Sequence, residues 1–302
     1  MRTADSMSLS NSTILVPLSA LYSAVTRARL AAYGRGLLSI SKLPAPVISV
    51  GNLTTGGTGK TPLVEWVCRK IANEGKRVCV LTRGYGRVNP GTQVVVSNGT
   101  EILTDEREAG DEPFLLAQNL VGLAAVICNP NRLEAGLWAI ENLGTQIFVL
   151  DDGFQYLRLS RDLNIVTIDA TDPWGGGSLL PQGRLREPRN SLSRSDCVVM
   201  TRADRNEDIN SIMEVVQGLA GDIPVFTSRM LTTSLRNLNG EPLVAPVEPA
   251  GAFCGVGNPE SVFNQLRREG YAPLFTRAFA DHHQYKQTDS TAWFERRKPM
   301  AP

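Results

Sequence analysis

Six consecutive residues, Gly56-Gly57-Thr58-Gly59-Lys60-Thr61, restrict this chain more than any other feature of its sequence. Glycines let backbone N–H groups curl around phosphate oxygens, and the amino end of a following helix adds positive potential. The lysine of such a loop reaches the β- and γ-phosphates, and the threonine hydroxyl can hold Mg²⁺. The alternative is a glycine-rich turn that happens to end in Lys-Thr. The loop lies between an expected strand and an expected helix, which favours the phosphate-binding interpretation.

A loop of this kind indicates a nucleoside triphosphate without specifying the reaction. Thr54 replaces the usual first glycine of the pattern. Some dimerising P-loop ATPases carry an additional lysine directly before the two glycines, and Thr55 at that position disfavours their class. The residues expected to contact the nucleotide are Thr55, Gly56, Gly57, Thr58, Gly59, Lys60 and Thr61.

A second nucleotide element is expected about 90 residues later, where the apolar run 147–150 ends in Asp151 and Asp152. An apolar strand that ends in carboxylates is the pattern of an acid that orders Mg²⁺ and its waters. A pair of turn aspartates at a strand end is the alternative. Beside a phosphate loop the metal interpretation is favoured, with Thr61, Asp151 and Asp152 as the predicted magnesium-site residues.

The expected elements alternate between strand and helix, which is typical of an α/β domain with a mainly parallel sheet. Beyond residue 225 the rhythm changes, and a smaller α/β domain follows. We therefore predict an α/β fold with a P-loop NTPase-type sheet and flanking helices, a small C-terminal α/β domain and an N-terminal amphipathic helix. Strands are expected at 47–50, 78–81, 94–96, 123–127, 147–150, 165–168, 198–200, 252–256 and 274–279, a strand or ribbon within 226–239, and helices at 61–72, 131–142 and 260–268.

Composition sets outer limits on the function. The 302 residues are 42% apolar and carry a net charge of +1, so nothing global points to a nucleic acid partner. The five cysteines are scattered without a Cys-x-x-Cys pair. This indicates buried thiols in a reducing compartment rather than a disulfide or zinc framework.

The N-terminal segment allows two interpretations. Residues 6–26 carry no charge, but polar residues and Pro17 interrupt them too often for a membrane-spanning helix. From Leu18 to Ala28 the apolar residues follow a helical spacing, and three arginines follow. Such a helix can lie in the headgroup region of a membrane, or it can pack on the core of its own protein. The pattern alone favours core packing.

An ordered series of short motifs resembles the lipid A 4'-kinase family over roughly residues 22–285. The series is Gly51-Asn52-Leu53-Thr54 with the loop and Pro62, Arg83-Gly84-Tyr85-Gly86-Arg87, Gly110-Asp111-Glu112-Pro113, Asp151-Asp152-Gly153-Phe154-Gln155, Leu179-Leu180-Pro181, Leu185-Arg186-Glu187-Pro188, Gly255-Val256-Gly257-Asn258-Pro259 and Phe279-Ala280-Asp281-His282-His283.

This resemblance implies transfer of the ATP γ-phosphate to the 4'-hydroxyl of a tetraacylated glucosamine disaccharide 1-phosphate. It implies ATP and Mg²⁺ as cofactors and an active site in the cleft between a P-loop domain, expected at 36–225, and a smaller domain at 226–302. It also implies that the helix within residues 1–35 docks peripherally on the cytoplasmic face of the bacterial inner membrane. A substrate with four acyl chains stays in the bilayer, which now favours the membrane interpretation of that helix.

The resemblance also suggests residue roles. Asp111 is the candidate base that accepts the proton of the sugar hydroxyl, although a helix N-cap is an equal alternative on sequence alone. His282 is expected near Asp111, where it would orient the carboxylate and tune its pKa; without the family a surface histidine pair is favoured. Lys60 completes the predicted catalytic set.

Four arginines crowd the Gly- and Pro-rich loop 172–193 and its end, and planar guanidinium groups suit phosphate. A solvated basic loop is the alternative. The predicted substrate-binding residues are Gln155, Arg184, Arg186 and Glu187.

Two departures from the family stand out: Ala280 replaces a usual proline, and residues 290–302 lack the expected Thr-Thr-x-Lys-Asp strand. We therefore expect an incomplete second domain.

Two other functions stay open at this point. One is a nucleotide-gated switch or assembly ATPase, for which Thr201-Arg202-Ala203-Asp204 is a poor match to a GTPase base-reading motif. The other is an inactive homologue that still binds nucleotide.

Overall fold

The computed structural model describes residues 6–232, 234–237, 239–244, 250–256, 259–280, 283, 285, 286 and 289, with the backbone alone for 6–14. The chain divides into two compact units, residues 1–231 and 232–302. Each unit is described by itself below.

The strands of the first unit are β1 (Val47–Asn52), β2 (Val78–Thr82), β3 (Val94–Ser97), β4 (Ala124–Cys128), β5 (Ile147–Asp151), β6 (Leu163–Asp169), β7 (Cys197–Thr201) and β8 (Val225–Thr227). They form one sheet in the order β3-β4-β2-β5-β1-β6-β7-β8. All neighbours pair in parallel except the edge strand β3, which is antiparallel to β4. The central strands are apolar and buried on both faces, as parallel sheets require.

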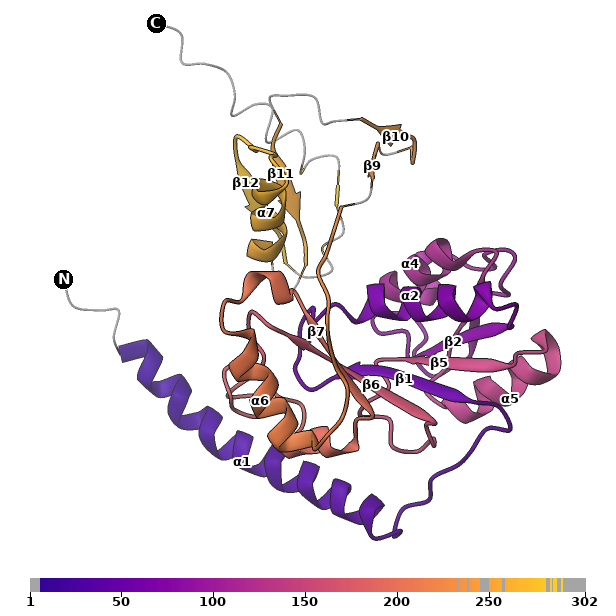
Figure 1. Cartoon of the computed structure of the whole chain (residues 1–302), viewed down its shortest axis with the longest axis horizontal. Coiled ribbons are helices and arrows are strands. Elements are labelled where there is room, and N and C mark those ends of the chain that lie inside the picture. The colour runs from indigo at the N-terminus through magenta and orange to yellow at the C-terminus, as the bar shows by residue number, and fades with distance from the viewer. Residues whose placement is uncertain are drawn as a thin grey trace, which may run out of the picture. The chain divides into compact units, whose positions relative to one another are not determined.

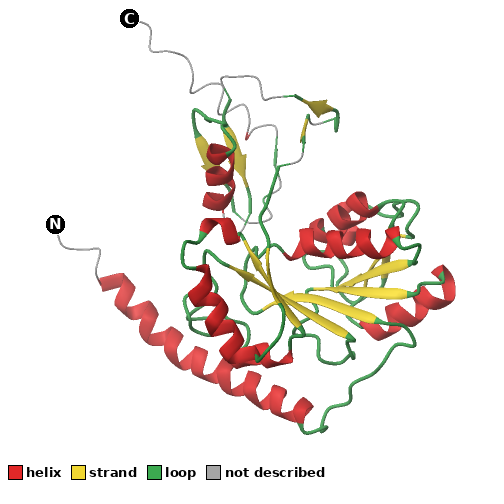
Figure 2. Ribbon diagram, viewed as in Figure 1, coloured by secondary structure: helices red, strands yellow, loops and turns green. Residues whose placement is uncertain are grey.

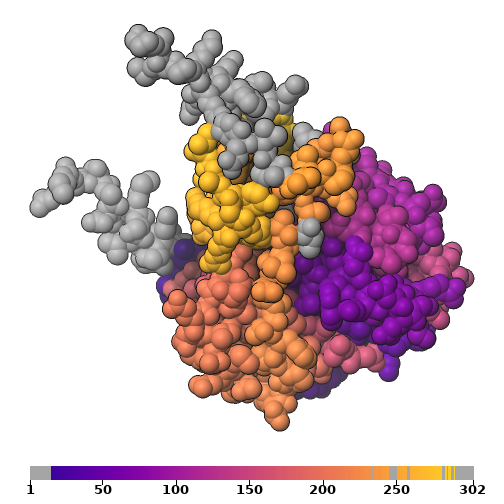
Figure 3. Space-filling model, turned by 45° about the horizontal axis from the view of Figure 1, so that its top comes forward, coloured from indigo at the N-terminus to yellow at the C-terminus, as the bar shows by residue number. Residues whose placement is uncertain are grey.

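Helices cover both faces of this sheet (Figures 1 and 2). One apolar cluster joins α2 (Lys60–Asn73) and α4 (Asp111–Leu120) to one face, and the two helices lie side by side on the surface (Figure 3). On the opposite face, α5 (Arg132–Leu143) packs on β1, β2 and β5, and α6 (Ile209–Ala220) packs on β6 and β7. Short helices α3 (Glu106–Ala109), η1 (Arg189–Arg194) and η2 (Ala203–Arg205) lie in the connections.

This topology brings distant segments to one edge. The loop after β1, the acids after β5 and the ends of β2, β6 and β7 all lie at the carboxyl ends of parallel strands. Parallel doubly wound sheets bind ligands along that edge.

The N-terminal helix α1 (Ser6–Gly34) is longer than the sequence pattern suggests, and it contacts the rest of its unit through polar groups. The Ser19 hydroxyl donates to the Leu179 carbonyl (2.9 Å), the Tyr22 hydroxyl to the Arg186 carbonyl (3.0 Å), and Arg29 to the Gln155 carbonyl (2.7 Å). Four of its apolar side chains point outward: Val16, Leu18, Leu21 and Val25 are 48–63% exposed. The core-packing interpretation is therefore wrong for these residues.

Across the residues searched, no helix has the length and apolar character needed to cross a bilayer.

The second unit contains β9 (Leu235–Arg236) and β10 (Pro242–Leu243), which are antiparallel, and β11 (Ala252–Cys254), α7 (Pro259–Arg268) and β12 (Thr276–Ala278). The strands β11 and β12 pair in parallel around α7, which confirms the strand, helix and strand expected there. The ring of His283 stacks on Phe279 with 4.4 Å between centroids, and its Nε2 lies 3.1 Å from Asp289 Oδ2.

The mainly parallel α/β sheet with flanking helices is confirmed. Every strand and helix expected between residues 47 and 200 is present, with ends shifted by a few residues. The pattern did not predict α4 or α6, and the strand expected within 226–239 is divided into β8 and β9. Because β8 pairs with β7, it belongs to the sheet of the first unit. The division expected at residue 225 stays a prediction.

Candidate active site

The phosphate loop is held open by backbone geometry. Gly56 and Gly59 have φ angles of 102° and 78°, a region that residues with a Cβ rarely adopt. Gly59 is the N-cap of α2, and a Cβ there would lie 3.2 Å from the Thr201 side chain. The Thr55 N–H donates to the Arg184 carbonyl (2.7 Å) and anchors the start of the loop. Lys60 opens α2 directly after it.

Buried polar side chains of the sheet hold the phosphate loop in place. Asn52 donates to the Thr58 hydroxyl (2.8 Å), which also lies 2.9 Å from the Thr167 hydroxyl on β6. All three side chains are buried, so these bonds are protected from water. They fix the Thr58 side chain and leave the glycines on either side free to face a ligand.

Asp151 ends β5 as a buried carboxylate and accepts a hydrogen bond from the Thr82 hydroxyl (3.1 Å) at the end of β2. Burial, followed by the negative charges of Asp152 and Glu112, raises the pKa of Asp151 to about 6, against the charge of Lys60 and the Thr82 hydrogen bond. A cation bound beside Asp151 would therefore favour its ionised form.

Asp152 is held by two cations. Arg186 donates two hydrogen bonds of 2.7 Å to its carboxylate, and the Lys60 Nζ lies 3.8 Å from its Oδ1. Partial desolvation raises the pKa of Asp152, but the hydrogen bonds and charge of Arg186 and the charge of Lys60 outweigh it and lower the pKa to about 2. Its φ of 51° is unusual for a residue other than glycine. The sheet edge thus joins the loop lysine, the acidic pair and one arginine of the basic loop.

The end of β7 contacts the phosphate loop from the other side. The Thr201 hydroxyl donates to the Thr58 carbonyl (2.9 Å), and Arg202 Nη1 donates to the Gly57 carbonyl (2.9 Å). Arg202 also forms an ion pair with Asp169 at the end of β6. In the structure, Thr201 and Arg202 of the segment compared with a base-reading motif therefore support the backbone of the phosphate loop.

Asp111 is the first residue of α4, and Gly110 takes the N-cap position. The N-cap alternative for Asp111 is therefore displaced by one residue. Gly110 packs closely on the loop 83–87, because a Cβ there would lie 2.6 Å from the Tyr85 carbonyl oxygen. The charge of Glu112, the next residue of the helix, reaches Asp151. The start of α4 therefore lies close enough to Asp151 for its charge to act there.

The predicted substrate-binding residues have different surroundings. Arg184 is largely exposed and pairs with Asp172. Gln155 donates to the Asn52 carbonyl (2.9 Å), and its Oε1 is buried without a partner among the described residues. Glu187 is buried and pairs with Arg194. Of the four, Arg186 alone contacts the acidic pair directly in the part of the chain described.

Two expected features are not settled by these contacts. His282 lies outside the described residues, so its predicted place near Asp111 stays a prediction. Within the described part of the chain, no group of three or more His, Cys, Asp or Glu side chains could hold a metal ion by itself. Mg²⁺ commonly uses one or two carboxylates together with phosphates and waters, so the Thr61 hydroxyl, Asp151 and Asp152 fit that ion.

Sequence reasoning missed several supporting groups: Asn52, Thr82, Thr167, Asp169 and Arg202. Each lies within or just past the end of a strand that was recognised. Polar residues at the carboxyl ends of strands that flank a phosphate loop were the available signal.

This arrangement defines the class of the protein, a P-loop enzyme that binds a nucleoside triphosphate at the carboxyl edge of a parallel sheet. A family model described as tetraacyldisaccharide-1-P 4'-kinase matches residues 11–300. The chain belongs to this family.

Curated relatives agree. The tetraacyldisaccharide 4'-kinases of Geobacter sulfurreducens and Pelobacter propionicus are 43% and 42% identical, over 91% and 90% of this chain and 77% and 74% of their own lengths. A solved structure of apo-form LpxK from Aquifex aeolicus in complex with ATP is 33% identical, with a TM-score of 0.74 over 91% of this chain and 84% of that chain.

These findings confirm the resemblance drawn from the motifs. The protein is an ATP-dependent kinase that phosphorylates the 4'-position of a tetraacyldisaccharide 1-phosphate lipid, with ATP and Mg²⁺ as cofactors. The kinase interpretation is favoured over the nucleotide switch.

Proposed function

We propose that this kinase performs the transfer at the carboxyl edge of its sheet, with the phosphate loop and Lys60 holding the triphosphate. The observation that carries the proposal is the convergence of Lys60, Asp152 and Arg186 within ion-pair distance. Mg²⁺ neutralises charge that develops during phosphoryl transfer. Thr61, Asp151 and Asp152 are the residues that would hold it. The ion pairs of Asp152 keep Lys60 and Arg186 next to the place where phosphates would bind.

Asp111 is the proposed base. A sugar hydroxyl is a poor nucleophile until a positioned carboxylate accepts its proton. The amino end of α4 lies close enough to Asp151 for the charge of Glu112 to act there, and the close packing of Gly110 on the loop 83–87 fixes where that helix begins. His282, carried over from the family motif, is proposed to orient Asp111.

Arg184 and Arg186 are proposed to bind phosphate oxygens of ATP or of the lipid substrate. Arg186 lies beside Asp152, and the Arg184 side chain lies 3.5 Å from where a Cβ on Gly56 would be. Gln155 and Glu187 are proposed to act through the loop: Gln155 bonds the end of β1, and Glu187 is fixed by Arg194 directly after Arg186.

Peripheral contact with the cytoplasmic face of the inner membrane is the remaining part of the proposal. The helix α1 binds its own unit through Ser19, Tyr22 and Arg29, and it leaves leucines and valines exposed. A water-facing helix normally shows the opposite arrangement. An apolar face directed outward suits the headgroup and acyl boundary of a bilayer, where a four-chain substrate resides. The helix that ends at residue 34 would then deliver lipid to the P-loop unit.

The experiment is transfer of labelled γ-phosphate from ATP to tetraacyldisaccharide 1-phosphate in detergent micelles. Transfer by the chain supports the proposal. Bound nucleotide without transfer would contradict it.

A further inference from the structure

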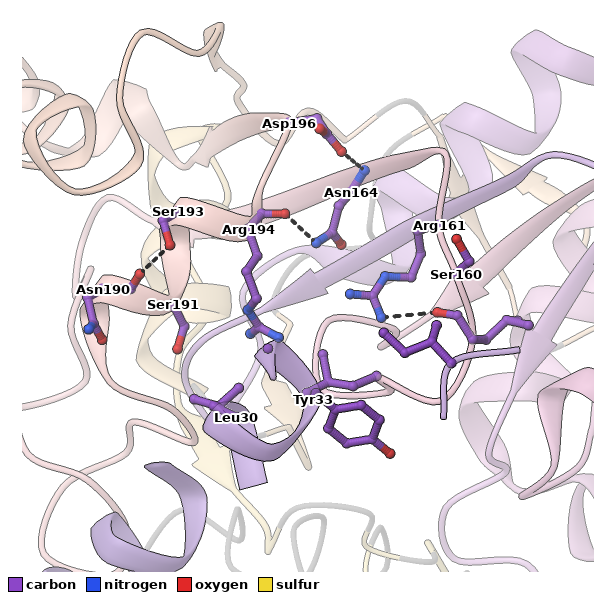
Figure 4. A pocket seen from close by; sticks show the side chains of 14 residues that line it. Leu30, Tyr33, Ser160, Arg161, Asn164, Asn190, Ser191, Ser193, Arg194 and Asp196 are labelled. Carbon is purple, nitrogen blue, oxygen red and sulfur yellow. Dashed lines mark hydrogen bonds between the residues drawn. The ribbon is translucent and has the colours of Figure 1, made fainter. Parts of the chain in front are cut away.

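A cavity of about 550 Å³ lies away from the nucleotide edge of the sheet. Three segments line it: the end of α1 with Leu30 and Tyr33 and the chain after it with Ile40, the loop before β6 with Arg161, and the η1 segment with Arg194. Figure 4 shows both guanidinium groups directed toward the end of α1. The cavity thus has one cationic wall and one apolar wall.

Both arginines have N–H groups that bond no acceptor among the described residues. Arg161 uses only Nη1, which donates to the Tyr156 and Leu159 carbonyls, and its remaining N–H groups bond no acceptor among the described residues. Arg194 pairs with Glu187 through Nη2, whereas its Nε and Nη1 are buried and lack an acceptor in the described structure. The guanidinium of Arg194 also stacks over the Phe154 ring at 4.3 Å. Its buried donors without partners carry a desolvation cost that an anion would remove, whereas Arg161 is only half-buried.

The charges around the cavity also favour an anionic ligand. Burial, followed by the charge of Arg194, lowers the pKa of Arg161 to about 10, against the charges of Glu187 and Asp196. Burial also lowers the pKa of Arg194; the charge of Glu187 opposes this shift and the charge of Arg29 adds to it. Asp196 is the acidic residue in the lining, and its Oδ2 already accepts the Asn164 N–H (2.7 Å). Three arginines, Arg29, Arg161 and Arg194, therefore act here against two carboxylates, Glu187 and Asp196.

The apolar wall continues out of the cavity. Ile40 is 53% exposed and belongs to the lining, and Leu37 and Leu38 beside it are 73% and 42% exposed. A ligand with an anionic head and an apolar tail would match both walls at once. Free phosphate would use only the arginines.

The cavity is separate from the nucleotide site. Asn164 is near the amino end of β6, whereas Asp169 at its carboxyl end pairs with the residue that contacts the phosphate loop. Asn164 and Asp169 are five residue steps apart along the strand, or about 16 Å. ATP bound at the loop would not occupy the cavity.

We propose that this cavity binds the phosphodiester headgroup of an anionic phospholipid, with Arg161 and Arg194 on the phosphate and the start of the acyl region along Tyr33, Leu37 and Ile40. The site rests on the proposed membrane contact of α1 and gives it a chemical preference. Arg161 and Arg194 would act as a headgroup receptor, and α1 would supply the apolar contact. An anionic phospholipid of the membrane would in this way hold α1 at a fixed depth in the bilayer.

The test is calorimetric titration of the full chain, saturated with ATP, with dihexanoyl phosphatidylglycerol below its micelle-forming concentration. Dihexanoyl phosphatidylcholine and inorganic phosphate are titrated in parallel. The main variant is Ser193→Glu, because Ser193 is exposed at the lining and a carboxylate there repels phosphate. Ser193→Gln is the matched control. Arg161→Gln removes a positive charge from the cavity lining, and Asp196→Asn removes a negative one.

We expect one phosphatidylglycerol per chain, bound at least about tenfold more tightly than phosphatidylcholine or inorganic phosphate. Ser193→Glu and Arg161→Gln should each weaken binding by about tenfold or more, Ser193→Gln should change it by less than about twofold, and Asp196→Asn should tighten it. Equal affinity for inorganic phosphate would overturn the lipid assignment. Displacement by ATP, or titrations that do not respond to Ser193→Glu and Arg161→Gln, would overturn the site. Kinase transfer by the unchanged chain in phospholipid-free micelles tests the proposed function separately.

Discussion

Arg186 holds the carboxylate of Asp152 through two parallel hydrogen bonds of 2.7 Å. This bidentate geometry is specific to a guanidinium, since an ammonium is a point charge on a flexible stem. The same arginine contacts the Asn52 carbonyl at the end of β1 (3.1 Å). It therefore joins the basic loop, the acidic pair and the strand that leads into the phosphate loop.

Replacing this arginine should damage the site even when the charge is kept. We expect Arg186→Lys to reduce kcat/KM by about tenfold and Arg186→Gln by about 100-fold, because both lose the fork and the second also loses the charge. Steady-state kinetics with ATP and lipid substrate give the measurement. Arg158→Gln, at an exposed arginine of the loop before β6, is the control. Equal activity of Arg186→Gln and the control would contradict this role.

The proposed base gives a different kinetic signature. Asp111→Asn preserves the size of the side chain but cannot accept a proton, so kcat should fall by about 100-fold or more. The nucleotide affinity should stay within about twofold, because the phosphate loop and Lys60 do not depend on this carboxylate. Equilibrium ATP titration and single-turnover transfer separate the two effects. Glu106→Gln on the exposed face of α3 is the matched control. A loss of ATP affinity with normal turnover would assign Asp111 to nucleotide binding.

Support of the phosphate loop from β7 can be tested by removing one hydroxyl. Thr201→Val keeps the shape of the side chain and removes the donor to the Thr58 carbonyl. One buried hydrogen bond of this kind is worth about 1 kcal/mol, so the Kd for ATP should rise about fivefold. Thr227→Val, at an exposed threonine of β8, should change nothing. An unchanged Kd in Thr201→Val would show that the loop keeps its geometry without this bond.

The central fold could be predicted because its strands are apolar, short and regularly separated. The runs ending at Val50, Leu81 and Leu150 became β1, β2 and β5, since only a buried parallel sheet accommodates such segments. The sequence offered only a possible N-cap at Asp111 for α4, which begins at that residue. The amphipathic helix α6 was not predicted.

The candidate site could be predicted where a residue belongs to a local motif, as Lys60 and Asp152 do. The Arg202–Asp169 pair could not, because it joins the ends of two strands that become neighbours only in the folded sheet. Which face of α1 packs against the protein could not be predicted either, because that depends on contacts with segments far away in the sequence. Helical spacing identifies an apolar row, but it does not determine whether that row faces the protein or its surroundings.

Buried thiols predict a pH dependence. Burial, followed by the charge of Asp151, raises the pKa of Cys68 from 9.0 to about 12, and burial likewise raises the pKa of Cys128 to about 12. A folded-state pKa above the unfolded value means that the stability from the neutral thiols is complete below about pH 9 and is lost as the pH rises toward 12. Thiolate is the reactive form, so both cysteines should resist a disulfide reagent at pH 8.

The measurement compares thiol release in the native protein and in concentrated guanidinium chloride, where all five cysteines should react. Mass spectrometry of the labelled native protein should find Cys68 and Cys128 unmodified. Thr227→Cys, which places a thiol at an exposed position, is the positive control. Rapid native labelling of Cys68 would contradict the buried environment.

The outward apolar row of α1 makes the final prediction. Leu21 and Val25 are 63% and 61% exposed and lie four residues apart, on one face of the helix. Replacing both by glutamate places two charges where the bilayer boundary is expected, and we predict that most of the protein moves to the soluble fraction in vesicle sedimentation. Because neither side chain is buried in the protein, the thermal unfolding midpoint should stay nearly unchanged. Leu137→Glu, at an exposed leucine of α5, is the matched control and should sediment like the parent chain. Equal loss of vesicle binding in the control would mean that net charge, rather than this face of α1, governs the membrane contact.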